Sequence, residues 1–189
     1  MSKALKVLGA ADRVLFHKIN AVWTAPALNA VLPALTDLNR SPWFWAAVAL
    51  TAAVWILAGR GRALRRCAAL ALCVGASDLF CYRVLKPLVR RPRPQFSLPD
   101  VVLRAGGHSG YGFPSNHAAN VFAAAAFLSS FYPRLSALVF VLAAAVAYSR
   151  VYVGAHYPLD VLGGALIGLA IGRLGAGLLR LYERRRARG

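Results

Sequence analysis

The feature that most constrains this chain is a run of nineteen residues without a charged side chain, from Ser41 to Gly59, bounded by Arg40 and Arg60. As an α-helix with a rise of about 1.5 Å per residue, a run of this length crosses the apolar core of a bilayer. Inside that core the backbone N–H and C=O groups must be paired within the protein, and a helix pairs them within one segment. The run therefore predicts a transmembrane helix.

Four further apolar runs follow, at residues 67–82, 115–132, 135–149 and 157–179. The chain is 59% hydrophobic, which is too apolar for an ordinary soluble domain. We expect an all-α fold, an integral membrane helical bundle of five to six transmembrane helices. All 189 residues would form one membrane domain, divided into amphipathic N-terminal helices at residues 1–40, a helical bundle at 41–182, and a basic tail at 183–189.

The N-terminal segment, residues 1–40, is more polar than the runs that follow it. Val14, Leu15, Ile19 and Val22 fall near one helical face, and this pattern predicts an amphipathic helix. A second helical pattern continues to Asp37. We expect these amphipathic helices to lie in the membrane interface or to pack on the bundle; a single short, kinked span over residues 19–36 is the alternative.

The charge of the chain is strongly basic, with 23 Lys+Arg against 6 Asp+Glu and a net charge of +17. A nucleic-acid binder of this charge would be more polar, so we expect no nucleic-acid partner. The positive-inside rule assigns a loop at Arg60–Arg66 and the tail at Arg184–Arg188 to the cytoplasm. Residues 83–114 and 149–156 then share the opposite side, where their excess of arginine calls for an anionic ligand.

One segment on that opposite side pairs a histidine with a carboxylate. His156 and Asp160 are four residues apart, so on a helix that begins near His156 they share one face. A carboxylate there can hold one imidazole nitrogen as N–H and leave the other as a base or nucleophile. Arg150 supplies a fixed cation for an anionic substrate.

Two other segments fall on the same side. The first runs from Lys86 to Pro94 and is rich in arginine; by itself it is equally well explained as a cluster that attracts anionic lipid headgroups. The second is Pro114-Ser115-Asn116-His117, which opens an apolar helix after a glycine-rich loop. Helix N-termini present free N–H groups that favour anions, although an ordinary capped helix would carry the same residues.

Taken together, the three segments resemble the type 2 phosphatidic acid phosphatase superfamily, whose signature is K-x6-R-P, P-S-G-H and S-R-x5-H-x3-D. This chain has Lys86 six residues before Arg93-Pro94, the Pro114–His117 segment, and Ser149-Arg150 followed by His156 and Asp160 at the matching spacings. It departs from the pattern at Asn116, where the family usually has glycine. That position is expected to contribute mainly a backbone N–H, which asparagine retains.

The resemblance implies a role for each matched residue. His156 would attack phosphorus to form a phosphohistidine, Asp160 would orient it, and His117 would protonate the leaving oxygen and then activate water. The phosphoryl oxygens would be bound by Lys86, Arg93, Ser115, Asn116 and Arg150. The sequence has no Asp/Glu cluster suited to Mg²⁺, so we expect neither a metal nor another cofactor.

The resemblance also implies a substrate and a location. It favours a lipid phosphatase of the bacterial inner (plasma) membrane, with its active site facing the periplasm or exterior. The substrate would be a phospholipid or isoprenoid phosphate, with undecaprenyl diphosphate preferred and phosphatidylglycerophosphate, phosphatidic acid or lipid A phosphate as alternatives. Membrane lipids are the other expected contact, and no obligate protein partner is evident. The competing functions are a vanadium-dependent haloperoxidase and a non-catalytic anionic-lipid binder.

Four polar residues remain without a clear assignment. Asp78 lies inside an apolar run, and we expect it to pair with a basic residue near the site. Arg90 and Arg91 contact either a diphosphate or headgroup, or else solvent and lipid. His108 in the glycine-rich loop is interpreted as incidental.

Overall fold

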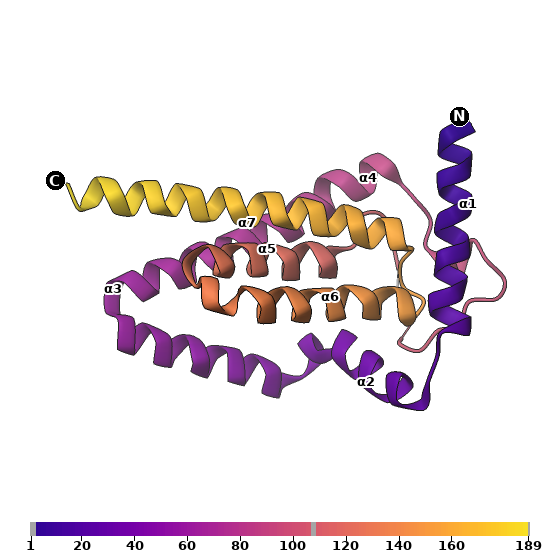
Figure 1. Cartoon of the computed structure of the whole chain (residues 1–189), viewed down its shortest axis with the longest axis horizontal. Helices are drawn as coiled ribbons and strands as arrows, with labels where there is room; N and C mark the ends of the chain where they lie inside the picture. The colour runs from indigo at the N-terminus through magenta and orange to yellow at the C-terminus, as the bar shows by residue number, and fades with distance from the viewer. Residues whose placement is uncertain (1–2, 107–108, 189) are drawn as a thin grey trace.

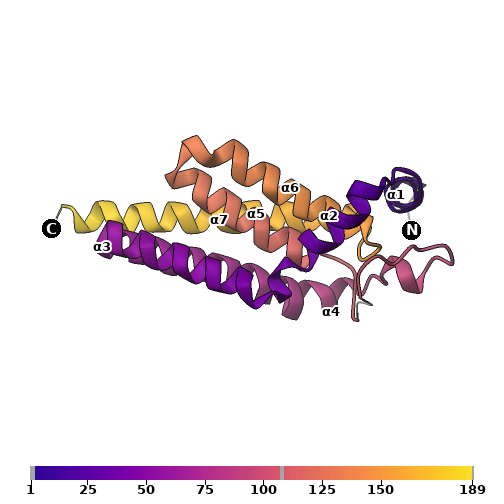
Figure 2. The same ribbon diagram turned by 90° about the horizontal axis from the view of Figure 1, so that it is seen from below.

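The computed structural model describes residues 3–106 and 109–188, and within these ranges every regular element is a helix, as expected (Figures 1 and 2). His108 lies outside the described residues. The elements, in chain order, are α1 (Lys3–His17) with a π-helical end (Lys18–Val22), α2 (Pro26–Thr36), α3 (Pro42–Phe80) with a π-helical continuation (Cys81–Leu85), α4 (Lys86–Val89), α5 (Asn116–Phe131), α6 (Ser136–Tyr152) and α7 (Pro158–Arg186). Short 3-10 turns lie at Leu38–Arg40, Pro94–Phe96 and Pro133–Leu135.

The basic stretch at residues 60–66 is helical, so the predicted loop there is wrong. Figure 1 shows α3 turning back sharply near its middle while remaining helical. A Cβ added at Gly59 would lie 2.7 Å from the Cβ of Ala63, whereas residues four apart on a straight helix have Cβ atoms about 5–6 Å apart. Arginine is a good helix former, and glycine at the bend lets the two halves approach without breaking the helix.

Among the described residues, four helical segments are long and apolar enough to cross a membrane: Pro42–Gly59, Gly61–Phe96, Pro133–Tyr152 and Pro158–Arg186. They contain four of the five apolar runs. The remaining run forms α5, which has 16 residues and so extends only about 24 Å. Its Ala119, Ala123 and Phe127 are fully buried, since α3, α6 and α7 pack around it. α5 is therefore the centre of the bundle.

Glycines of α7 bring it into backbone contact with α5. A Cβ added at Gly164, Gly168 or Gly172 would lie 2.1–2.4 Å from a carbonyl oxygen of α5 or of its N-cap, Ser115. Small residues allow this approach in membrane helices, where van der Waals packing drives association. This close packing fixes the start of α5 against the start of α7.

The two ends of the bundle differ in what they carry. Figure 1 places the bend of α3, the turn between α5 and α6, and the C-terminus at one end. The segment that follows α4 and the turn between α6 and α7 lie at the other end. The predicted grouping of segments is therefore seen in the structure, with the three motif segments at a single end.

The N-terminal helices cover that same end. α1 runs across the bundle axis in Figure 1 and is seen end-on in Figure 2. The chain breaks helical geometry between Val22 and Pro26, so residues 19–36 do not form one continuous span. Phe16 and Ile19 pack in a buried cluster with Tyr152 and Tyr157, which flank the turn between α6 and α7. The packed arrangement expected for the amphipathic pair is the one observed.

Candidate active site

A pocket of about 580 Å³ lies where the three motif segments meet. Its lining includes six of the predicted site residues: Lys86, Arg93, Asn116, His117, Arg150 and His156. Two predicted site residues, Ser115 and Asp160, are fully buried behind this lining. The fold therefore brings all eight predicted residues to one end of the bundle, in a layer of lining groups and a layer that supports them.

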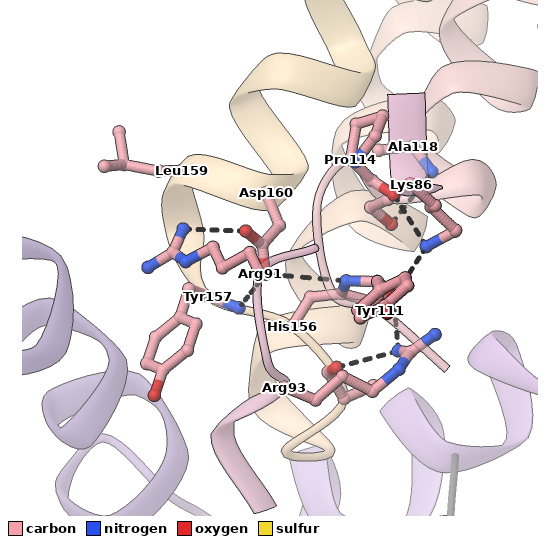
Figure 3. Close-up of polar contacts among 12 residues, drawn as sticks. Lys86, Arg91, Arg93, Tyr111, Pro114, Ala118, His156, Tyr157, Leu159 and Asp160 are labelled. Atoms are coloured by element: carbon pink, nitrogen blue, oxygen red, sulfur yellow. Dashed lines mark hydrogen bonds and ion pairs between the residues drawn. The ribbon is translucent and has the colours of Figure 1, made fainter. Parts of the chain in front are cut away.

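His156 sits in the turn between α6 and α7, which Gly154 closes with a left-handed φ of 86°. Its Nδ1 is 3.7 Å from Oδ2 of Asp160, beyond ordinary hydrogen-bond length, and it has no hydrogen-bond partner among the described residues. That carboxylate oxygen instead accepts the backbone N–H of Tyr157 at 3.0 Å and caps α7 (Figure 3). Catalytic hydrogen bonds often shorten only when substrate is bound.

The other ring nitrogen of His156 faces Arg93. Nη1 of Arg93 lies 3.0 Å from His156 Nε2 and donates to the carbonyl oxygen of Ala155 at the same distance. A guanidinium can only donate, so Nε2 must be the unprotonated nitrogen and Nδ1 must carry the proton. The tautomer that this contact selects directs N–H toward Asp160 and a lone pair into the pocket.

The pKa of His156 is well below that of a free histidine. Burial is the main cause, followed by the charges of Arg93, Arg150 and Lys86. Both effects disfavour an added positive charge. The imidazole is therefore neutral at pH 7, the state that a nucleophile requires.

The three predicted phosphate clamps are each about nine-tenths buried or more. Nζ of Lys86 donates to the carbonyl oxygens of Tyr111 and Pro114, at 2.8 and 3.0 Å. Nη1 of Arg150 donates to Oγ1 of Thr36, at the end of α2, at 2.6 Å. These neutral oxygens fix the position of the Lys86 ammonium and of one nitrogen of the Arg150 guanidinium beside the pocket.

The start of α5 supplies the next group of predicted residues. Ser115 is the N-cap, and its hydroxyl accepts the backbone N–H of Ala118 at 3.5 Å. Its hydroxyl thus supports the helix end, while His117 reaches the pocket lining. The side chain of Asn116 also lines the pocket and donates to Oδ1 of Asp78 at 2.9 Å.

Asp78 has amide partners rather than the expected basic residue. Its Oδ1 accepts from the side-chain amides of Asn116 and Asn120, at 2.9 and 3.0 Å, and no ion pair to it occurs in the described part of the chain. The pairing prediction is therefore wrong in its partner, because amides of α5 already occupy the carboxylate. Arg90 is exposed and donates to the carbonyl oxygen of Pro87 at 2.8 Å.

Sequence reasoning missed several residues around the pocket. Arg83 and Tyr82 line it from the π-helical continuation of α3. Thr36 and Asp12 support it from the N-terminal helices. The expectation that Arg91 contacts a phosphate, a headgroup, solvent or lipid is wrong, because its guanidinium bridges Asp12 to Asp160. Arg83 precedes Lys86 by three residues, which was an available signal. The contacts of Thr36 and Asp12 join residues far apart in sequence and leave no local pattern.

The residues present do not match a protein metal site. No group of three or more His, Cys, Asp or Glu side chains able to hold a metal ion occurs within residues 3–106 and 109–188. The lining of the pocket consists of cations, histidines and neutral groups. This donor set suits an oxyanion.

Comparison with known proteins identifies the family. The sequence profile of the PAP2 superfamily matches residues 62–184. Lipid A 4'-phosphatase of Bacteroides thetaiotaomicron is 40% identical over 107 residues, which cover 53% of this chain and 48% of that protein. This chain thus spans about half the length of that relative. The decaprenylphosphoryl-5-phosphoribose phosphatase of Mycolicibacterium smegmatis is 31% identical over 163 residues, covering 81% of this chain and 80% of that protein.

The fold has a solved counterpart. The crystal structure of a transmembrane PAP2 type phosphatidylglycerolphosphate phosphatase from Bacillus subtilis is similar to this chain, with a TM-score of 0.69 and 27% sequence identity. The similarity covers 95% of this chain and 88% of that one, so it includes the N-terminal helices as well as the bundle.

Proposed function

The chain belongs to the PAP2 superfamily, and we propose that it is a membrane-bound phosphatase of lipid phosphates that acts through a phosphohistidine on His156. The observation that carries this proposal is the pocket lined by Lys86, Arg93 and Arg150 together with two histidines, one of which has an unprotonated Nε2 that accepts from Arg93. Buried cations that line one pocket bind an oxyanion strongly. Its place at one end of a bundle of apolar helices suits a substrate whose phosphate lies at the membrane surface.

The first chemical step transfers the phosphoryl group to the enzyme. The lone pair of His156 Nε2 attacks phosphorus, the N–P bond forms, and the bond from phosphorus to the lipid oxygen breaks. His117 donates a proton to that leaving oxygen. Arg93 turns its donors from Nε2 to the phosphoryl oxygens, where Lys86 and Arg150 also bind the developing charge. Asp160 stabilises the positive charge that His156 gains.

The second step releases phosphate. His117, now neutral, takes a proton from water as the water oxygen attacks phosphorus. The N–P bond breaks, its electron pair returns to His156, and inorganic phosphate leaves. The chain's own cations supply the charge stabilisation in both steps.

Arg83 favours a substrate with more than one phosphate. Arg83 lines the same pocket as the three clamps, but its side chain is exposed. The adjacent Tyr82 also lines the pocket and is 58% exposed. A fourth cation at the pocket mouth suits the second phosphate of a lipid diphosphate such as undecaprenyl diphosphate. We expect Arg83→Gln to slow release from a diphosphate more than from a monophosphate, and Arg90→Gln to affect both little.

The test of this function is phosphate release by the purified protein in mixed micelles. The panel contains undecaprenyl diphosphate, phosphatidylglycerophosphate, phosphatidic acid and lipid A phosphate. His156→Ala serves as the blank and His17→Ala, an exposed histidine of α1, as the matched control. Acid-labile, alkali-stable labelling of the wild type by a ³²P-labelled substrate would identify the phosphohistidine. Equal phosphate release by wild type and His156→Ala would refute the mechanism.

The competing functions predict different results. A haloperoxidase would oxidise halide when supplied with vanadate and peroxide, whereas the proposed phosphatase is inhibited by vanadate. A non-catalytic anionic-lipid binder would bind the panel lipids and release no phosphate. We further propose residence in the bacterial plasma membrane with the pocket facing the exterior, because the Arg184–Arg186 end of α7 then lies in the cytoplasm.

A further inference from the structure

The side chain of Arg91 forms ion pairs with two carboxylates and does not line the pocket. Its Nη1 donates to Oδ1 of Asp160 at 2.7 Å, and its guanidinium lies 4.3 Å from the ring centre of Tyr157 (Figure 3). It is absent from the pocket lining, although it stands two residues from Arg93 in the sequence. The charge of Arg91 is thus directed at the support of His156 and away from the phosphate.

The second carboxylate comes from the N-terminal amphipathic helix. Oδ2 of Asp12 on α1 accepts from Nη2 of Arg91 at 2.5 Å. Its other oxygen accepts the backbone N–H of Leu159, in the first turn of α7, at 2.9 Å. The side chain of Asp12 is 1% exposed. One residue of α1 therefore contacts both the arginine that holds Asp160 and the helix end from which Asp160 projects.

We propose that Asp12 is a positioning residue for the phosphatase reaction, acting through Arg91 to orient Asp160 against His156, and that docking of α1 completes the active site. This proposal rests on the phosphatase function proposed above. Asp12 lies in the N-terminal segment, outside residues 62–184, the stretch matched by the PAP2 superfamily.

The geometry explains why two carboxylates are needed. One carboxylate oxygen of Asp160 accepts the backbone N–H of Tyr157 and the other accepts from Nη1 of Arg91. Both oxygens are therefore fixed by a hydrogen bond. Without Asp12, nothing described on the far side of Arg91 would hold its second nitrogen, and the arginine could turn toward the pocket. Asp160 would then lose one of the two contacts that set its angle to His156. A misplacement of about 1 Å in such a group costs on the order of 10²-fold in rate.

The placement of α1 links this contact to the membrane surface. α1 crosses the bundle axis in Figure 1. Its apolar residues Val7, Leu8, Val14 and Leu15 are exposed. An apolar face of this kind binds in the plane of the interface. Asp12 and Phe16 are the buried residues of the same helix, with Phe16 against the ring of Tyr157 at 5.3 Å.

The test compares Asp12→Asn and Arg91→Gln with two exposed controls of the same chemistry, Asp100→Asn and Arg90→Gln. We expect Asp12→Asn and Arg91→Gln each to lower kcat by roughly 10- to 100-fold. The unfolding temperature of every variant is measured in parallel. The inhibition constant of inorganic phosphate should stay at its wild-type value, since the clamps are untouched. The double variant should lose no more activity than the worse single variant, because both act through Asp160.

Three outcomes would overturn the proposal. The first is wild-type kcat in Asp12→Asn, and the second is a weaker inhibition by phosphate in Arg91→Gln, which would make Arg91 a clamp. The third is a loss of activity in Asp12→Asn that only follows loss of folded protein. The rate at which diethylpyrocarbonate modifies His156 gives a readout independent of turnover. If the wild type releases no phosphate, the proposed function fails. A changed rate of His156 modification in Asp12→Asn, with an unchanged rate in Asp100→Asn, would still support the positioning role.

Discussion

Replacing Gly168 with alanine should separate the two helices on which the site is built. A Cβ at this position would lie 2.1 Å from the carbonyl oxygen of Ala119, whereas real Cβ contacts stay beyond 3.0 Å. The obstacle is the backbone of α5, which cannot swing aside as a side chain would. α5 and α7 must therefore move apart by roughly 1 Å at this point, because close-packed interiors do not absorb such an overlap.

The expected cost follows from two opposing terms. Overpacking costs about 1–3 kcal/mol, and alanine gains about 1 kcal/mol over glycine in helix propensity. We expect a net loss of up to about 2 kcal/mol. Activity should fall further than stability, because the displaced helices begin beside His117 and Asp160, and a misplacement of about 1 Å costs on the order of 10²-fold.

Gly177 of α7 provides the matched control. A Cβ added there meets no atom within 4 Å, so Gly177→Ala should gain about 1 kcal/mol and keep full activity. The assay is thermal unfolding of both variants in the same detergent, together with phosphate release per folded molecule. The reasoning is refuted if Gly168→Ala unfolds at or above the temperature of Gly177→Ala and remains fully active.

Three further predictions follow from the site. The neutral state of His156 stabilises the fold above pH ~6.5, because its folded pKa lies below the unfolded value; stability should fall as the pH drops below ~6.5. The difference in unfolding temperature between wild type and His156→Asn, measured from pH 8 to 5, should shrink over that range, and a constant difference would contradict this. Excess EDTA should leave phosphate release unchanged, since the pocket presents cations to the phosphate; loss of activity that Mg²⁺ restores would exclude the mechanism. Asp78→Leu should lower the free energy of unfolding by about 1–2 kcal/mol, because it leaves the side-chain amides of Asn116 and Asn120 without their acceptor. In the Asn116→Gly background, which lacks one of these amides, Asp78→Leu should lower the unfolding temperature less.

The parts of the site that sequence predicts well are those whose chemistry and spacing reinforce each other. His156 and Asp160 are tied by one helical turn, and the cations Lys86 and Arg93 cluster next to an apolar run, so both segments are recognisable locally. The convergence of three segments at one end of the bundle follows from alternating helix direction.

The parts that sequence does not predict depend on contacts between distant residues. Asp12 is 79 residues from Arg91 and 147 from Leu159, and no periodicity connects them. The helical course of residues 60–66 was missed because a cluster of arginines is read as a loop, although arginine itself favours helix. Ser115 illustrates a third case: its type and position indicate an anion-binding helix start, while its hydroxyl is directed to the helix it caps.

The contact between α5 and α7 also has an entropic consequence. It is built from Gly164, Gly168 and Gly172 on one side and from alanines on the other, none of which has side-chain rotamers to lose on folding. Long side chains at such an interface would give up rotamer freedom and could repack in more than one way. Here the relative position of His117 and Asp160 depends on backbone meeting backbone, so the site is ordered before substrate arrives and little conformational entropy is left to lose on binding.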